Sequence, residues 1–209
     1  GILVVKDGAF VVADGASIEI PDAIHDLWTV RLRDALAHGP RQDRQALELA
    51  ALLGLQVDNQ EWEAVCRQAA LDRPEALVDR LLKRGLAIDR ERGWAFAHGM
   101  LAESVMRIAR EQGRLAAGQE TVAGVLWERG RQLKNLGDAP AAEVALTRAE
   151  RLSRTLDRPR LRAGVLSSLS DACLDLGNAE RALHHLEQAM ATLEALQDPM
   201  LESGVLNNL

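Results

Sequence analysis

Few side chains in this sequence have the types and spacing that catalysis requires. Asp171 and Asp175 lie four residues apart, which puts both carboxyl groups on one face of a helix. General acid-base catalysis would need a neighbouring histidine or a carboxyl group with a raised pKa, and the sequence indicates neither. The pair therefore favours a polar binding surface over an acid-base site.

Histidines and cysteines give little support to a metal site. His184 and His185 are neighbours, and neighbouring helical side chains point about 100° apart, so the two rings do not converge on one ion. A solvated helix face is the favoured interpretation. Cys66 and Cys173 lack the paired spacing of a zinc site or of a disulfide framework. They are expected to be small core residues of a protein in a reducing compartment, which predicts a cytoplasmic location.

The sequence also lacks the motifs of nucleotide chemistry. It contains neither the glycine-rich Lys-Ser/Thr loop that binds phosphates nor the acidic strand that holds magnesium. A hydrolase built around His98 or the histidine pair would need a nucleophile beside it, and none is evident. We therefore expect no catalytic residue, no metal and no cofactor in these 209 residues.

Charge and hydropathy argue against two kinds of partner. The formal net charge is -6, with 12 basic and 16 acidic residues over 1–97 and 13 and 15 over 98–209. Nucleic acid is an improbable principal partner, because lysine and arginine supply most of that affinity. The longest apolar stretches are shorter than the roughly 20 residues of a membrane helix. No secretory signal opens the chain, and the missing initial methionine suggests a fragment.

The elements that must position these side chains fall into two halves. The stretch ILVVKDGAFVV predicts a β-hairpin that turns at Asp7-Gly8, within a first region of residues 1–20. Residues 21–97 show three or four short helical patterns, followed by LAID and WAFAH around the polar turn RERG. Helices followed by a β-hairpin are the order of a winged-helix domain, in which Trp28, Trp62 and Trp94 are expected core residues. Residues 98–122 are expected to form connecting helices.

The second half repeats itself at an interval of 40 residues. Gly-Val-Leu occurs in AGVLWERG from residue 123, in AGVLSSLS from residue 163 and in SGVLNNL from residue 203. Self-similarity at a fixed period indicates stacked helical hairpins. The matching pairs are Gly137 and Gly177, Ala142 and Ala182, Leu146 and Leu186, Ala149 and Ala189, Leu156 and Leu196, and Pro159 and Pro199.

This pattern resembles the tetratricopeptide repeat, with a period longer than the usual 34 residues. The glycine and alanine positions match well, whereas Leu126 and Leu166 replace the usual aromatic residue and Arg129 occupies a normally apolar place. The resemblance implies two full repeats, 123–162 and 163–202, and the start of a third at 203–209. The predicted fold is therefore mainly α: small β-hairpin elements, a winged-helix-like domain and an α-hairpin solenoid.

In tetratricopeptide stacks the first helix of each pair lines the concave side, where proteins or peptides bind. The residues that this resemblance places in the groove are Trp127, Arg131, Lys134, Asn135, Ser167, Asp171, Asp175 and Asn207. An equally supported alternative is that Trp127 packs against the preceding helix and that the other residues are merely solvated.

The order of elements, with the stretches PDAIHDLWTVRLRDAL, ALELAALLG, LLKRGLAI and FAHGMLAESV, resembles bacterial multidomain signal-transduction ATPases. In that family a winged helix joins an AAA-like ATPase to C-terminal tetratricopeptide repeats, and a Ser/Thr kinase or DNA-binding domain can lie elsewhere. The resemblance implies that residues 1–20 end an ATPase lid and that ATP, ADP and magnesium bind upstream.

The same resemblance gives His98 a possible function. Its place after Phe96-Ala97 is similar to the Met-His-Asp motif that senses bound ADP in related switches, although Gly99 replaces the acid. The alternative is that His98 caps its helix or packs beneath Phe96.

Two functions from different classes follow. The first is a non-catalytic regulatory and scaffold segment, whose winged helix relays nucleotide state from an ATPase in cis and whose repeats bind a protein or peptide. The second is a transcription regulator whose winged helix contacts DNA, which requires a basic recognition helix. The segment DNQEWEAVCRQAALD carries more acid than base, which favours the first function.

Overall fold

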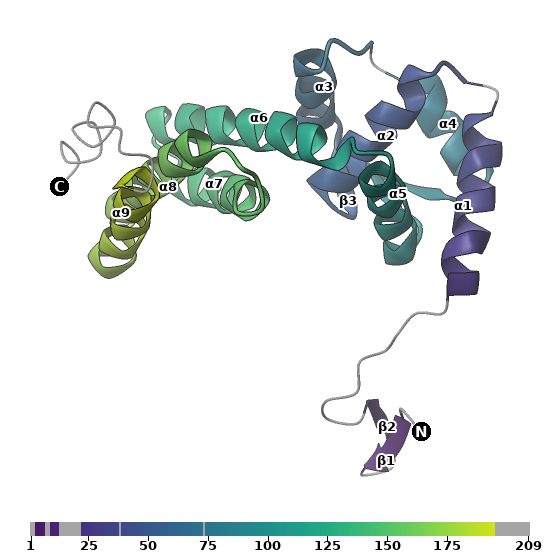
Figure 1. Ribbon diagram of the computed structural model, residues 1–209, viewed down its shortest axis with the longest axis horizontal. Coiled ribbons are helices and arrows are strands. Elements are labelled where there is room, and N and C mark those ends of the chain that lie inside the picture. Colours follow the sequence, from purple (N-terminus) through teal and green to yellow (C-terminus); the bar gives the residue numbers. More distant parts are fainter. Residues whose placement is uncertain (1–2, 7–8, 13–21, 38, 73, 195–209) are drawn as a thin grey trace.

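The computed structural model describes residues 3–6, 9–12, 22–37, 39–72 and 74–194, with side chains from Trp28 onward. Nine helices and two small antiparallel sheets make up this described part, so the chain is mainly helical (Figure 1). Strands β1 (Leu3–Lys6) and β2 (Ala9–Val12) pair with Lys6 opposite Ala9, which confirms the predicted N-terminal hairpin.

Four helices and a three-stranded sheet form the next part of the chain. The order is α1 (Asp22–Leu36), α2 (Gln42–Leu53), β3 (Gln56–Asp58), α3 (Asn59–Gln68), α4 (Glu75–Lys83), β4 (Ala87–Arg90) and β5 (Gly93–Phe96). The sheet order is β3-β5-β4, so the hairpin of β4 and β5 adds β5 to the short strand that precedes α3.

Helix α2 lies at the centre of this part because it is apolar on nearly every side. Residues 46–53 are all buried, and Gly54 ends the helix with a φ of 127°, a value that glycine accepts readily. Trp62 and Trp94 are also buried, as the sequence predicts, with ring centroids 5.4 Å apart in an edge-to-face contact. Trp28 is only half-buried and lies at the rim of the core.

Two long helical hairpins follow α5 (Gly99–Glu111). They are α6 (Leu115–Asn135) with α7 (Ala139–Ser153), and α8 (Pro159–Asp175) with α9 (Ala179–Glu194). Helix α6 already begins at Leu115, so residues that we expected in connecting helices form the first turns of the first hairpin. Figure 1 shows α6 running from the sheet-containing part toward α7, α8 and α9.

The two hairpins turn in the same way because the same residues recur 40 positions apart. Gly137 and Gly177 adopt φ values of 82° and 74°, the left-handed conformation that ends a helix. The next residue caps the second helix: Asp138 Oδ1 accepts a hydrogen bond from the Ala141 backbone N–H (3.1 Å), and Asn178 Oδ1 accepts one from the Arg181 N–H (3.2 Å).

Small residues let the two helices of each hairpin approach closely. A side chain on Gly130 would begin 2.5 Å from Leu146 Cγ, so glycine is required where α6 meets α7. The equivalent residue on α8 is Ser170, whose buried hydroxyl donates to the Ala182 carbonyl on α9 at 2.9 Å. The paired repeat positions that carry the packing are all buried: Leu126 and Leu166, Ala142 and Ala182, Leu146 and Leu186, Ala149 and Ala189.

The equivalence of the two turns predicts equal costs for removing either cap. Asp138→Ala and Asn178→Ala should each lower the free energy of unfolding by about 1 kcal/mol, the usual cost of losing a side-chain N-cap. Chemical denaturation monitored by circular dichroism measures both. A cost near zero for one cap and a normal cost for the other would contradict the structural equivalence.

The two parts of the chain share one core. A continuous cluster of buried apolar side chains extends from Leu32 on α1 to Val165 on α8, and it includes Ala123 and Leu126 on α6 and Ala149 on α7. The helices that carry the candidate site are therefore held against the sheet-containing part by direct apolar packing.

Candidate partner-binding cleft

The predicted groove residues on α6 and α8 lie partly together. The Trp127 ring packs over Gly164 of α8, where an added Cβ would lie 2.7 Å from the indole, and its Nε1 donates to Ser168 Oγ at 2.9 Å. Trp127 thus packs against α8, the first helix of the next hairpin. The Arg131 guanidinium lies 5.9 Å from the centre of the indole, within cation-π distance.

The remaining groove residues form a mixed polar surface. Lys134 Nζ of α6 contacts Asp171 Oδ2 of α8 at 3.0 Å, and both side chains are partly exposed. Asn135 and Asp175 are exposed and Ser167 is half-buried. Asn207 lies outside the described residues. The structure therefore brings Lys134 together with Asp171 and Trp127 together with Arg131, and it leaves Asn135 and Asp175 at the ends of their helices.

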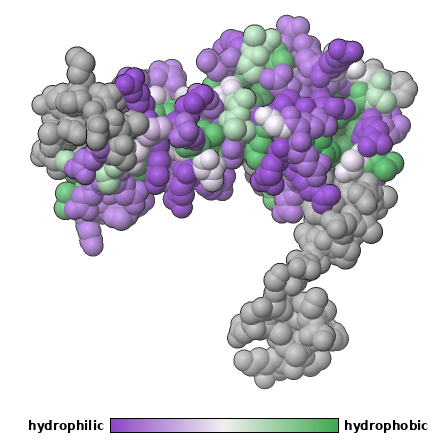
Figure 2. Space-filling view, in the orientation of Figure 1, coloured by the Kyte–Doolittle hydropathy of each residue, from purple (hydrophilic) through white to green (hydrophobic). Residues whose placement is uncertain are grey.

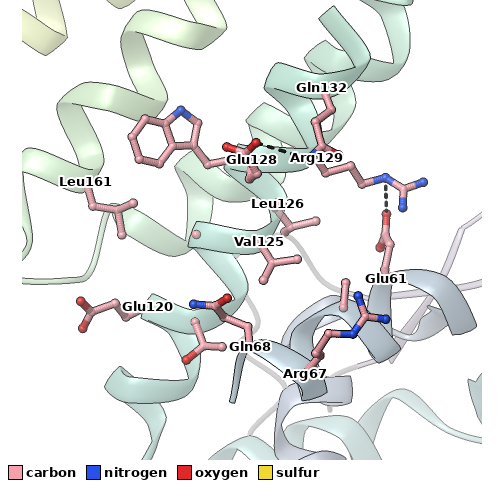
Figure 3. Close-up of a pocket in the computed structure, with 14 residues that line it drawn as sticks. Glu61, Arg67, Gln68, Glu120, Val125, Leu126, Glu128, Arg129, Gln132 and Leu161 are labelled. Atoms are coloured by element: carbon pink, nitrogen blue, oxygen red, sulfur yellow. Dashed lines mark hydrogen bonds and ion pairs between the residues drawn. The ribbon is translucent and has the colours of Figure 1, made fainter. Parts of the chain in front are cut away.

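A cleft of about 900 Å³ lies beside this surface, between α3, α6 and the start of α8 (Figure 3). Figure 3 shows α6 crossing between α3, which carries Glu61, Arg67 and Gln68, and Leu161 on α8. The lining residues are Glu61, Ala64, Arg67, Gln68, Glu120, Thr121, Gly124, Val125, Leu126, Trp127, Glu128, Arg129, Gln132 and Leu161. Trp127 is the one predicted groove residue among them.

The cleft has an apolar floor and a charged rim. Val125 and Leu161 are half-buried, and nothing lies within 4 Å of the position that a Gly124 Cβ would take. Two rim carboxylates already have cationic or amide partners: Glu120 pairs with Arg158 at 2.9 Å, and Glu128 accepts from Gln132 at 3.3 Å. Figure 2 shows hydrophilic residues over most of the visible face, with smaller hydrophobic areas between them.

Gly124 and Gly164 occupy the same place in successive hairpins but have different surroundings. The Trp127 ring covers Gly164, whereas the space over Gly124 is open to the cleft. Helix α3 contributes the small Ala64 and the polar Gln68 to this cleft, and neither fills it. The cleft is therefore the uncovered counterpart of a site that, one repeat later, holds an indole.

An ion cluster closes the cleft on the side of α7. Glu61 is buried, and its carboxylate accepts from Arg148 Nη1 of α7, with N–O distances of 3.0 and 2.8 Å. Arg148 Nη2 also donates to the Leu53 carbonyl at the end of α2 (3.0 Å). Arg129 Nε of α6 lies 3.6 Å from Glu61 Oε1, beyond direct hydrogen-bond distance. Three helices and the end of α2 meet at one carboxylate.

Sequence reasoning missed Glu61 and Arg148 because their contact joins residues far apart in the chain. The sequence did contain one signal of this cluster, at Arg129. Arg129 occupies a place that is normally apolar in the repeat, and its counterpart Leu169 is indeed buried. The departure from the pattern occurs because the Arg129 side chain faces a carboxylate of α3 instead of an apolar neighbour.

His98 caps α5, as one of the two interpretations expected. Its Nδ1 accepts from the Met100 backbone N–H at 3.3 Å, and its ring stacks on Trp28 with centroids 5.8 Å apart. The Arg31 guanidinium also lies over the Trp28 ring, 5.1 Å from its centre. These contacts give His98 a structural role in the described residues.

The cysteines and the histidine pair lie outside the lining of the cleft. Burial raises the pKa of the Cys66 thiol to about 11, and it also raises that of Cys173, so neither is poised for nucleophilic chemistry. Burial, and then the charge of His184, lowers the pKa of His185. Within the described ranges, no three His, Cys, Asp or Glu side chains lie where they could hold a metal ion. Nor does any helix there combine the length and apolarity of a membrane span.

Comparison with known protein families, with curated proteins and with solved structures found no match.

Proposed function

We propose that this chain is a non-catalytic regulatory and scaffold segment that binds a protein or peptide in the cleft between α3, α6 and α8. The observation that carries the proposal is the open space over Gly124. One repeat later the equivalent space over Gly164 holds the indole of Trp127, whose N–H reaches Ser168. Glu128, which occupies the position of Ser168 in the first hairpin, offers a carboxylate acceptor at the edge of the cleft.

The Trp127 indole that fills the space over Gly164 indicates which side chains the equivalent space over Gly124 accepts. A bulky apolar side chain, best an aromatic one, fits over Gly124 and against Val125 and Leu161. The polar rim would fix the orientation of the partner backbone, since interfaces combine a few apolar anchors with surrounding polar contacts. The partner is thus a segment that presents such an anchor.

The elements around the cleft are consistent with a segment that passes a signal from one domain to the repeats. The element order from α2 to β5 and the sheet order β3-β5-β4 support a winged helix, and the matching turns of the two hairpins support a tetratricopeptide solenoid. In a signal-transduction ATPase the winged helix would pass nucleotide state from an ATPase domain in cis to the repeats. Within this proposal His98, on the Trp28 face, is the candidate nucleotide sensor of the whole protein.

Direct DNA contact by the winged helix has weaker support. Helix α3, which the sequence analysis considered for base recognition, buries Glu61, Trp62, Val65 and Cys66 and lies against α2 and α6. Helix α4 carries Glu75 and Asp79 beside Arg80 and Lys83, so it is not basic either.

Filling the cleft tests the proposal. Peptides selected from a display library for binding to the 209-residue chain should be enriched in aromatic anchors. They should lose at least about tenfold in affinity for Gly124→Phe, because nothing lies within 4 Å of the Cβ position among the described residues and the new ring would enter the cleft. The matched control is Ala191→Phe, at an exposed position of α9 outside the cleft. Selected peptides that bind both variants as well as the original chain would refute the proposed site.

A further inference from the structure

A second cavity lies on the other side of the Glu61 ion cluster. It has a volume of about 480 Å³ and lies between β3, the turn from β4 to β5, α6 and α7. Its ionisable lining consists of four arginines and two carboxylates: Arg90, Arg92, Arg129, Arg148, Asp58 and Glu61. The local charge is therefore +2, in a chain whose formal net charge is -6. We name it the arginine pocket.

Three of these arginines have donors that their neighbours do not use fully. Arg92 Nη2 is 3.4 Å from Asp58 Oδ2, and Arg129 Nε is 3.6 Å from Glu61. Within the described residues, Arg90 donates to the carbonyl of its neighbour Asp89 at 3.4 Å and to no other group. A guanidinium carries five N–H donors in a planar fork, so each of the three can bind a further oxyanion.

The two carboxylates also bind groups other than these three arginines. Asp58 Oδ1 caps α3 and accepts from the backbone N–H groups of Gln60 (2.9 Å) and Glu61 (3.1 Å). Glu61 is held by Arg148, which also binds the Leu53 carbonyl. Two carboxylates therefore offset the charge of the four arginines only in part, and Arg90, Arg92 and Arg129 approach the cavity from the β4–β5 turn and from α6.

We propose that the arginine pocket is a phosphate-binding site. A phosphate monoester carries a charge near -2 at neutral pH and three acceptor oxygens, which match the charge of the pocket and the unused guanidinium donors. The bound group bridges the β4–β5 turn to α6. The same chemistry could come from a free phosphate anion or from a phosphorylated side chain, and the two sources are separated by the test. This site shares Glu61 and Arg129 with the cleft of the proposed function, but its other lining residues differ and it does not depend on the binding of a partner there.

Titration with inorganic pyrophosphate, followed by calorimetry and by backbone amide shifts, tests the site. Arg92→Gln and Arg129→Gln should each weaken binding about tenfold, since each removes charge-assisted hydrogen bonds to the anion. The matched control is Arg67→Gln. Its side chain is 74% exposed, as is that of Arg92, and it forms an ion pair with Glu63 at 3.1 Å, but it does not line the arginine pocket. It should leave the affinity unchanged.

A phosphoserine peptide and its unphosphorylated form make up the second arm. Tighter binding of the phosphopeptide than of pyrophosphate, lost in Arg92→Gln, would assign the site to a phosphorylated partner. Equal or weaker binding would assign it to a free anion, and both results support the site. The proposal would be wrong if Arg67→Gln weakened binding as much as Arg92→Gln, or if pyrophosphate did not saturate. Duplex DNA that bound more tightly through the same arginines would overturn it too.

Discussion

Replacing Trp62 with alanine is expected to lower the free energy of unfolding by about 4 kcal/mol, within the range measured for large aromatic residues cut back in protein cores. Trp62 is 2% exposed, and it joins three elements: it lies on α3, meets Trp94 of β5 edge-on, and donates from Nε1 to the Ala46 carbonyl of α2 at 2.8 Å. The substitution removes all of these contacts and leaves a cavity that the rigid helices cannot close.

Two variants show whether this cost arises from packing at Trp62. Trp62→Phe keeps an aromatic ring and loses the hydrogen bond, so it should cost about half as much. Trp28→Ala is the matched control, because Trp28 is half-buried at the rim of the same core and its Nε1 has no partner within the described residues. Denaturant unfolding curves measure all three. Equal losses for Trp28→Ala and Trp62→Ala would contradict the central position of Trp62.

The helical hairpins could be anticipated from sequence because their signals are local. Gly137 and Gly177 end helices by their own backbone freedom, and Asp138 and Asn178 cap the next helix within three residues. The buried leucines and alanines follow from the 40-residue period, since each hairpin repeats the packing of the other. Such features need no knowledge of which distant segments meet.

The candidate site is different, because it forms where the repeat stops matching. Arg129 and Arg148 replace what are Leu169 and Gln188 in the second hairpin, and both arginines face Glu61 of α3. In the described part of the chain the second hairpin has no such carboxylate beside it, and its counterparts are apolar or neutral. The sequence contains the mismatch, but only the packing of α3 beside α6 explains it.

The same reasoning applies to the cleft. The repeat pattern predicts a groove position for Trp127, and the ring lies over Gly164 and completes the packing between α6 and α8. The open site is the equivalent one over Gly124, where α3 supplies no comparable side chain. A search for binding residues within a repeat protein should therefore begin at the hairpin that lacks a preceding neighbour of its own kind.

Glu61→Gln is expected to lower the free energy of unfolding by about 3 kcal/mol, at the lower end of the range for one partner removed from a buried ion pair. The amide keeps one acceptor for Arg148 and turns an NH₂ group toward a guanidinium, so the charge of Arg148 is left without compensation beside the core. The cost stays at the lower end because the Arg148 and Arg129 side chains are 26% and 33% exposed, and water replaces part of the lost interaction.

The matched control for this cluster is Glu63→Gln, two residues away on the same helix. The Glu63 side chain is 42% exposed and meets Arg67 at 3.1 Å one turn later, so its neutralisation should cost less than about 0.5 kcal/mol. Adding Arg148→Met to Glu61→Gln should recover part of the lost stability, because removing both partners of a buried ion pair costs less than removing one of them. Thermal and denaturant unfolding measure each variant. If Glu61→Gln were as mild as Glu63→Gln, the cluster would not tie α7 to α3, and the two parts of the chain would be joined by apolar packing alone.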